Sequence, residues 1–461
     1  MLHEVDCLIV GATILTLNKA REIIRDGAVA IEGGRLVAVG KATEVQGTYR
    51  GREHIDANGF LLTPGFVDGH IHITGDPLTR GFPRAVSEEG FADSLEKYVI
   101  PLYRNHTPED EHLSARLAAL AMLKSGTTCF MEAGTVSHLD AVVAGLRETG
   151  IGGRVGNWIE GRAFDPATAQ EALSRQEIDR LEQQIAAYPA DGGALIAATP
   201  VLVGHVTNSD AVWQAAKRLA DAHGLTVSAH MSPHADDPDW YLANIGRRPI
   251  VHLAELGALG PNVCLTHVAH IDDAEFKALV ESGTNVIHCP HGAVYHAFGV
   301  SKVGRFPEML EAGVNVLFGT DGIATDIQRS AQMMAGVFKD ARMDSTVLPA
   351  TQLLEMATLN GARALGLDPD IGSLEVGKKA DLVLHDTNRP EMRPLFDPVG
   401  QLMTDTDGRS VHSVWVDGQR VVANGRATLI DEAPLIEQAQ RAGEEIIARC
   451  GLSIESVWPT R

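Results

Sequence analysis

The sequence predicts an α/β protein in which a (β/α)8 TIM-type barrel carries a small β-sandwich domain built from both terminal segments. Between about residues 61 and 367, eight short β-rich runs alternate with helical patterns. This alternation fits a closed parallel barrel better than an open sheet. Before and after this region the patterns are those of short strands, too few at either end for a separate core. No Gly-x-Gly-x-x-Gly motif follows the first strand, which disfavours a dinucleotide-binding fold.

The two terminal segments need each other to form a core. Glycine-rich turns at Gly33-Gly34 and Asp417-Gly418 each link apolar runs into a predicted β-hairpin. We therefore expect residues 1–60 and 368–428 to pair in one small β domain beside the barrel. Residues 429–461 read as a C-terminal helix and tail.

The barrel region of residues 61–367 contains helix signals between its strands. Thr107, followed by a proline and acids, is typical of a capped helix start. The sequence Asn208-Ser209-Asp210 opens a second helix, which Gly224 ends. The predicted strands are 62–72, 127–132, 152–159, 194–201, 225–230, 262–267, 284–288 and 315–321.

Composition and charge exclude several classes of partner. The net charge of −21 argues against nucleic acid or an anionic membrane. No apolar run approaches the ~18 residues of a membrane span, and the acidic N-terminus is unlike a secretory signal. The five cysteines are scattered without a Cys-x-x-Cys motif. We therefore expect a cytoplasmic protein without disulfides or a thiolate zinc site.

The stretch 64–72 ends in two histidines on an apolar strand. Successive side chains of a strand point to opposite faces, so Asp68, His70 and His72 share one face. Two imidazoles side by side on a rigid strand form half of a metal site. The alternative is a chance His-x-His pair in a loop, which the apolar residues around the pair disfavour.

Other metal-binding residue types lie at the predicted ends of later strands. Active sites of such barrels sit at the C-terminal ends of the strands. The fifth strand ends in His230, the sixth in His267 and the eighth in Asp321. Each alone could be a core or rim residue, but together with the first-strand pair they predict a metal site.

These motifs resemble those of the amidohydrolase superfamily, and most of all its cytosine deaminase, S-adenosylhomocysteine deaminase and triazine hydrolase branch. The resemblance spans nearly the whole chain. It rests on Pro-Gly-Phe-Val-Asp-Gly-His-Ile-His at 64–72, the two later histidines, Gly-Thr-Asp-Gly at 319–322, and the stretches 357–362 and 371–381. These motifs are specific to the superfamily but not to a substrate.

The resemblance implies that one divalent metal is bound by four residues: His70, His72, His230 and Asp321. Such a site, with water completing the shell, suits zinc best, with iron as the alternative. Binuclear members of the superfamily bridge two metals with a carboxylated lysine on the fourth strand. Residues 194–205 contain no lysine, so we expect one metal.

The resemblance also implies two catalytic roles. His267 would polarise the substrate or hold the leaving group, and Asp321 would accept a proton from water as well as bind the metal. This fits the general chemistry of the residue types. Water bound to a cation has its pKa lowered from ~15.7 toward ~7. A carboxylate beside it can take the proton and pass it to a leaving nitrogen.

The loop after the fifth strand departs from the branch it resembles. Deaminases of this branch carry a glutamate three residues after the strand-five histidine, where it shuttles a proton to the ring nitrogen. Position 233 is proline here. Either His234, Asp236 or Asp237 takes that role, or the reaction does not need it. Alternatively, the two aspartates only cap a helix that begins near residue 238.

A second departure follows the seventh strand, where Cys289-Pro290 precedes His291 in place of the usual Ser-Asn pair. His291 is therefore a candidate for substrate binding. His205, at the end of the strand-four region, is another, although it could equally be a loop histidine. Both departures argue against the usual deaminase substrates and leave metal binding intact.

The sequence thus predicts a metal-dependent enzyme that hydrolyses a C–N bond of a small cyclic or heteroaromatic compound. One alternative keeps the site but releases chloride or another non-nitrogen leaving group. Another is a non-catalytic barrel used for binding, which the intact ligand set disfavours. We expect a homo-oligomer acting on a small-molecule substrate, because oligomers are frequent in the superfamily that the chain resembles.

Overall fold

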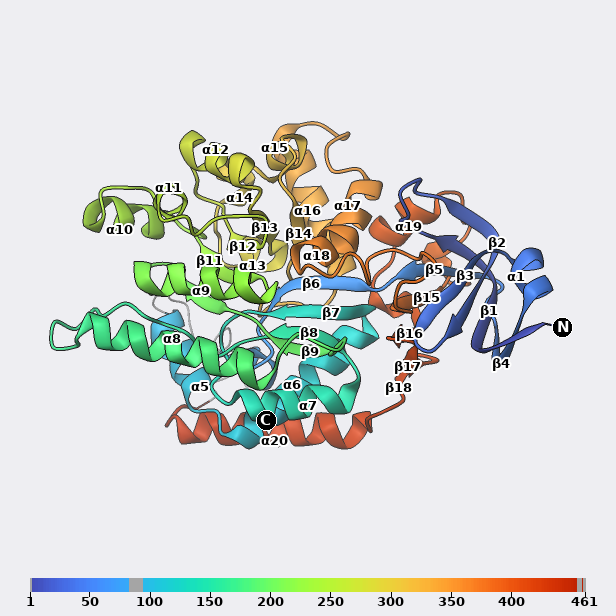
Figure 1. Ribbon diagram of the computed structural model, residues 1–461, viewed down its shortest axis with the longest axis horizontal. Helices are drawn as coiled ribbons and strands as arrows, with labels where there is room; N and C mark the ends of the chain where they lie inside the picture. Colours follow the sequence, from blue (N-terminus) through green and yellow to red (C-terminus); the bar gives the residue numbers. More distant parts are fainter. Residues whose placement is uncertain (1, 83–93, 454–457, 459–461) are drawn as a thin grey trace.

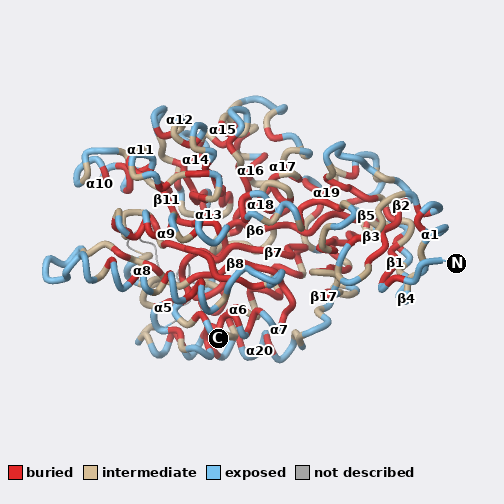
Figure 2. The backbone as a smooth tube through the Cα atoms, in the orientation of Figure 1, coloured by how far each residue is buried: buried red, intermediate tan, exposed pale blue. Residues whose placement is uncertain are grey.

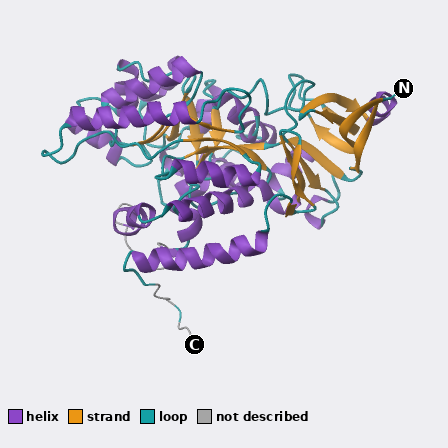
Figure 3. Cartoon of the chain, turned by 60° about the horizontal axis from the view of Figure 1, so that its bottom comes forward, coloured by secondary structure: helices purple, strands orange, loops and turns teal. Residues whose placement is uncertain are grey.

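The computed structural model describes residues 2–82, 94–453 and 458. It shows a large α/β body with a β-rich part at the end that holds the N-terminus (Figure 1). The strands of the described residues form sheets of nine, five and four strands. The turned view in Figure 3 shows the β-rich part as a gathering of strands beside the helix-rich body.

The nine-stranded sheet joins both ends of the chain, as the sequence predicted. β5 pairs antiparallel with β15, the first of the C-terminal strands. β2 and β3 form the hairpin expected at Gly33-Gly34, and β16 and β17 form the one expected at Asp417-Gly418. The strands are β1 His3–Leu15, β2 Ile23–Glu32, β3 Arg35–Lys41, β4 Tyr49–Asp56, β5 Phe60–Pro64, β15 Leu382–Asp386, β16 Val411–Val416, β17 Gln419–Ala423 and β18 Arg426–Ala427.

The two smaller sheets are parallel, in the orders β6-β7-β8-β9 and β10-β11-β12-β13-β14. The amide of Asp321, just after β14, donates to the carbonyl of His70 in β6 at 2.9 Å, so the last parallel strand lies beside the first. This mixed α/β fold is consistent with a TIM-type barrel. The strands are β6 Phe66–Ile71, β7 Thr127–Glu132, β8 Gly152–Val155, β9 Ile196–Ala198, β10 Val201–Gly204, β11 Val227–Met231, β12 Val263–His267, β13 Asn285–His288 and β14 Val316–Phe318.

Two predicted strands are each divided next to a proline, which has no amide hydrogen to donate to a neighbouring strand. The run 62–72 becomes β5 and β6, and the chain changes sheets after Pro64. The terminal sheet therefore extends a few residues beyond the expected boundary. The run 194–201 becomes β9 and β10 on either side of Pro200, and β10 continues to residue 204.

Helices cover the outside of the parallel strands, whose residues are buried along the centre of the body (Figure 2). The helix predicted from Thr107 is α6, and the side chain of Thr107 accepts from the Asp110 amide at 3.2 Å. The helix predicted from Ser209 is α9, which ends at Gly224 in a left-handed conformation. The predicted C-terminal helix is α20.

The α-helices of the described residues have the following bounds: α1 Ala42–Thr48, α2 Asp76–Thr79, α5 Ile100–Arg104, α6 Pro108–Lys124, α7 Leu139–Thr149, α8 Gln170–Ala187, α9 Asp210–His223, α10 Asp236–Asn244, α11 Pro249–Glu255, α12 Asp273–Ser282, α13 Pro290–Tyr295, α14 Val300–Val303, α15 Phe306–Glu311, α16 Ile327–Arg342, α17 Ala350–Ala357, α18 Leu359–Ala364, α19 Pro398–Thr404 and α20 Glu432–Arg449. Within the described part of the chain, none of them is long and apolar enough to span a bilayer. The five cysteines are all free thiols.

Candidate metal and substrate site

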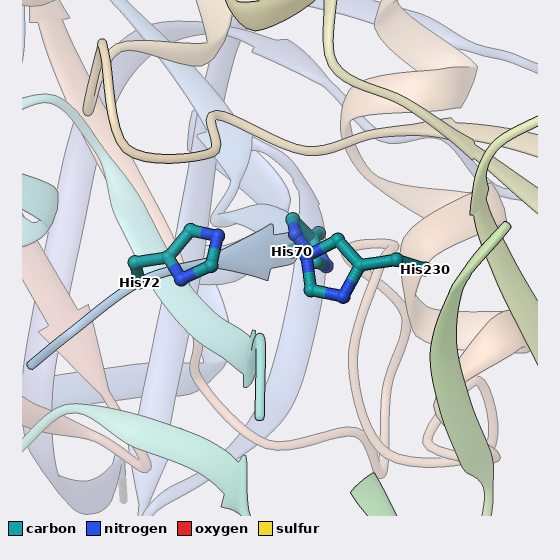
Figure 4. A group of neighbouring side chains, drawn as sticks. All are labelled: His70, His72 and His230. Carbon is teal, nitrogen blue, oxygen red and sulfur yellow. The ribbon is translucent and has the colours of Figure 1, made fainter. Parts of the chain in front are cut away.

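Three of the predicted metal ligands come together between β6 and β11. His70 lies in β6, His72 is the first residue after the end of β6, and His230 lies in β11. Each ring offers one nitrogen, and these nitrogens lie within 4.8 Å of one another. Figure 4 shows the three rings facing a common space. The convergence arises because His70 and His72 lie at the C-terminal end of β6 and His230 lies near the C-terminal end of β11.

Hydrogen bonds to the far side of two rings fix how they face the site. Nδ1 of His230 donates to the carbonyl oxygen of Val203 at 2.8 Å, which leaves its Nε2 as the possible ligand atom. Nδ1 of His70 is hydrogen-bonded to the hydroxyl of Thr266 at 3.1 Å. Partners of this kind set the tautomer and orientation of metal-binding histidines.

Asp321 completes the group from the end of β14. Its Oδ1 lies 3.2 Å from Nε2 of His72 and accepts from the Gly322 amide at 2.8 Å. The carboxylate lies against the backbone of Gly292, and a Cβ added to that glycine would lie 2.3 Å from Oδ2 of Asp321. Burial favours the neutral acid, but the hydrogen bond from His72 and the nearby His267 hold the pKa of Asp321 well below its usual range.

His267 lies at the end of β12 and closes another side of the site. Its ring centroid lies 5.8 Å from that of His70 and 5.6 Å from that of His230. The ring packs edge-on against Phe298, and its Nδ1 is buried with no hydrogen-bond partner in the described structure. Burial lowers the pKa of His267 to about 4, so the ring is neutral at pH 7. Ligand atoms of His267, Cys289 and Asp321 also lie within 4.8 Å of one another.

The two predicted substrate-binding histidines lie in different surroundings. His205 follows β10 directly, and its ring lies nearly parallel to that of His230 at 5.1 Å. Its Nδ1 is 2.9 Å from the carboxylate of Asp237. His291 is on α13, and its Nδ1 bonds the hydroxyl of Ser330 at 3.2 Å. Within the described residues, no hydrogen bond or ring contact joins His291 to the histidine group, and its role stays a prediction.

The candidates after the fifth strand are separated by burial. Asp236 is exposed, whereas Asp237 is 8% exposed. Neither side chain caps its own helix, because α10 begins at Asp236 and has no side-chain cap. Instead Asp237 accepts from the amide of Ser232 at 2.8 Å as well as from His205. His234 packs edge-on against Phe298.

Further polar residues of the site were not identified from the sequence. Glu132, at the end of β7, is fully buried and accepts from the amides of Gly134 at 2.6 Å and Thr135 at 3.0 Å. Burial raises its pKa to about 7. Burial raises the pKa of Asp76, which lies near His72 and Tyr103 on the same side of the site. The rule that located the histidines, reading the last residue of each strand, would also have found Glu132.

A buried carboxylate links the first and last parallel strands. Asp68 in β6 accepts from the amide of His70 at 3.1 Å and from that of Thr320 at 3.0 Å, and the Thr320 hydroxyl also donates to it. These bonds fix the position of His70 relative to Thr320, the residue that precedes Asp321.

Comparison with known proteins identifies the family. A model of the amidohydrolase family matches residues 61–421. The chain belongs to the amidohydrolase family. This confirms the resemblance found in the sequence. The chain is therefore a hydrolase that acts on carbon–nitrogen bonds, and its histidine-rich site supports a divalent metal.

Relatives within the amidohydrolase family include named deaminases. The chain is 29% identical over 439 residues to a 5-methylthioadenosine/S-adenosylhomocysteine deaminase of Syntrophobacter fumaroxidans, covering 94% of this chain and 97% of that protein. It is 31% identical over 457 residues to a 5'-deoxyadenosine deaminase of Methanosarcina mazei, covering 96% and 99%.

Solved structures of similar proteins contain zinc. An adenosine deaminase from Xanthomonas campestris with bound zinc superposes with a TM-score of 0.87 at 27% identity, covering 97% of this chain and 100% of that chain. Atrazine chlorohydrolase from Arthrobacter aurescens, complexed with zinc, gives a TM-score of 0.84 at 21% identity, covering 95% and 100%. The second likeness shows the fold alone.

Proposed function

We propose that this amidohydrolase is a mononuclear zinc aminohydrolase that removes an amino group from a small heteroaromatic compound. The observation that carries the proposal is the convergence of His70, His72 and His230 within 4.8 Å, with Asp321 beside His72. Three imidazoles and one carboxylate are a ligand set that suits zinc, and iron is the alternative. The adenosine deaminase structure with bound zinc supports the choice of metal.

The chemistry of the donor set supports a bound cation. Nε2 of His70 is buried and has no hydrogen-bond partner within the described residues. A buried polar atom of this kind costs free energy unless something binds it. The hydrogen bonds on the far side of His70 and His230 also leave the remaining nitrogen of each ring directed to the site.

A divalent cation held by His70, His72, His230 and Asp321 would supply Lewis acidity, which would lower the pKa of a water molecule there toward ~7. Asp321 is ionised at neutral pH and can accept the proton of that water and pass it to the leaving nitrogen. His267 presents a neutral imidazole that can polarise the electron-poor carbon or hold the leaving group.

The substrate class follows from the relatives and from the loop after β11. Named relatives are deaminases of adenine-containing compounds, which supports an amino-substituted heteroaromatic ring. Pro233 cannot shuttle a proton to a ring nitrogen, and it offers no backbone donor. We therefore expect adenosine, S-adenosylhomocysteine and cytosine to be poor substrates compared with rings that need no such protonation.

The proposal is tested by metal analysis and a substrate screen on the same purified protein. Elemental analysis should give about one zinc or iron per chain; two metals would contradict the mononuclear site. A panel of amino- and halo-heterocycles should release ammonia. Release of chloride without ammonia would favour the halide-releasing alternative, and full activity in chelator would exclude the metal-dependent scheme. Efficient deamination of adenosine would overturn the interpretation of Pro233.

We also propose the finer architecture that suits this function. The parallel strands would close into a (β/α)8 barrel over 61–367, with 1–60 and 368–428 as the small β domain and 429–461 as helix and tail. The terminal sheet would fold over itself as a sandwich. In support, apolar residues of β1 and β2 share a cluster with residues of β15 and β16, among them Ile9, Ile31, Leu384 and Trp415.

The enzyme would act in the cytoplasm as a homo-oligomer. The five free thiols suit a reducing compartment. Cell fractionation tests the location, and light scattering of the purified protein tests the oligomeric state.

A further inference from the structure

A histidine–carboxylate pair lies beside the ligand set and is not part of it. Nδ1 of His205 is 2.9 Å from Oδ2 of Asp237, and the same oxygen accepts from the amide of Ser232 at 2.8 Å. The Asp237 side chain is 11% exposed and that of His205 is 29% exposed. The pair connects the end of β10 to the start of α10, across the end of β11. Two donors on one buried carboxylate oxygen hold that carboxylate in a single place.

The backbone is left-handed at His205 itself and at Ser232, whose amide donates to Asp237. His205 has a φ of 49° and Ser232 a φ of 49°, in the left-handed region that residues other than glycine rarely adopt. A residue in this conformation costs free energy and persists only where the surrounding structure holds it. The His205 amide also donates to the His230 carbonyl at 2.9 Å, which fixes the bend against β11. The two bends bring the ring of His205 and the carboxylate of Asp237 together.

The pair leaves one ring nitrogen of His205 available. Because a carboxylate accepts at Nδ1, that nitrogen carries the hydrogen. Nε2 has no hydrogen-bond partner within the described residues and the side chain is partly exposed. The ring lies nearly parallel to His230, with 19° between the planes and 5.1 Å between the centroids. His205 therefore lies beside the ligand histidine His230, and its Nε2 has no hydrogen-bond partner among the described residues.

We infer that Asp237 is a positioning residue that fixes the His205 ring so that Nε2 forms a hydrogen bond with the edge of a heteroaromatic substrate. The inference rests on the proposed function for the identity of the substrate. It assigns to Asp237 a role that acts through His205 and not through the metal. Asp237 is distinguished from its neighbours on α10 because Asp236 and Asp239 are exposed.

A double-mutant cycle on the zinc-loaded enzyme tests this coupling. The variants are His205→Ala, Asp237→Ala and the double variant, with Asp239→Ala as the matched control on the same helix. If Asp237 acts through His205, kcat/KM falls by roughly 10- to 100-fold in each single variant, and the double variant falls no further than His205→Ala. Since the contact is made to bound substrate, we expect KM to rise more than kcat falls. Zinc content stays unchanged.

Other outcomes overturn the inference. Losses that multiply in the double variant would show that Asp237 acts independently of His205, and loss of zinc in Asp237→Ala would show that it supports the ligands. An equal loss in Asp239→Ala would reduce the effect to helix destabilisation. If Asp237→Ala fails to fold, Asp237→Leu replaces it, because leucine has a similar volume and removes both acceptor oxygens.

A structural measurement separates this inference from the proposed function. Crystal structures of the zinc-loaded wild type and Asp237→Ala should show the His205 ring rotated or disordered only in the variant. A ring that keeps its orientation overturns the inference, whatever the activity. A wild type that hydrolyses no heterocycle of the panel overturns the proposed function, while the ring orientation still decides whether Asp237 holds His205.

Discussion

At the scale of single residues, Nδ1 of His267 lacks the kind of hydrogen-bond partner that Nδ1 of His70 and Nδ1 of His230 each have. Its ring is buried and neutral, and its Nδ1 has no hydrogen-bond partner in the described structure. A neutral imidazole can polarise a reacting group without adding charge to the site. We predict that His267→Asn keeps the metal while kcat falls by ~100-fold or more, as expected for the loss of one electrophilic or acid–base group. Steady-state kinetics and elemental analysis of the variant check this.

The control for this prediction is His223→Asn, at the exposed C-terminal end of α9. It should leave both kcat and metal content unchanged. Loss of metal in His267→Asn would make His267 a ligand, and unchanged activity would make it a structural histidine.

The residues that the sequence identified are those that a strand places by its period. His70 and His72 were predictable because two residues apart on a strand means one face, and His230 because of its strand end. The pairing of His205 with Asp237 was not predictable. It depends on a left-handed backbone bend after β10 and on the path of a loop, and neither leaves a periodic signal in the sequence.

At the scale of elements, β10 and β11 approach closely at the site. Gly204 has a φ of 81°, and a Cβ there would come within 2.2 Å of the carbonyl oxygen of His230. We predict that Gly204→Ala displaces β11 and lowers zinc affinity by roughly tenfold or more, a loss typical of disturbed support around a metal ligand. Competition with a chelating dye measures the affinity.

The matched control is Gly224→Ala, at the end of α9. Gly224 has a φ of 63° but no heavy atom within 4 Å of its ideal Cβ. The substitution should therefore cost stability, about 1 kcal/mol, without changing zinc affinity. Equal zinc affinity in the two variants would contradict the role assigned to the contact between β10 and β11.

The order of the elements could be predicted from the sequence, but the division of two predicted strands into two strands each could not. The runs 62–72 and 194–201 read as continuous strands because their apolar residues are continuous. The chain changes sheets after Pro64 because β5 pairs antiparallel with the strand of residues 382–386. That partner lies more than 300 residues away, and no local pattern encodes the pairing.

At the scale of the whole molecule, the two ends of the chain are joined where β5 pairs antiparallel with β15, and we call this pair of strands the seam. His385 of β15 is fully buried in this seam. Its Nε2 lies 3.3 Å from the Thr63 hydroxyl and its Nδ1 lies 3.0 Å from the Ser410 hydroxyl. The Thr63 and Ser410 hydroxyls also donate to the backbone carbonyl oxygens of Pro64 and Asp407, at 2.9 and 3.0 Å. Burial lowers the pKa of His385 to about 3.

The stability of the molecule should therefore depend on pH through this seam. The unfolded chain binds a proton at His385 below its ordinary pKa of 6.5, whereas the folded chain does so only near 3. The stability is complete above pH 6.5 and is lost as the pH falls from there toward 3. By pH ~5 the loss is about 2 kcal/mol.

We predict that His385→Gln, which keeps a donor and an acceptor, removes that part of the pH dependence. Urea unfolding of both zinc-loaded proteins at pH ~7.5 and ~5 measures the difference, in which the effect of the ligand histidines, common to both, cancels. An equal loss of stability in the two proteins would show that His385 titrates in the folded state as it does in the unfolded chain.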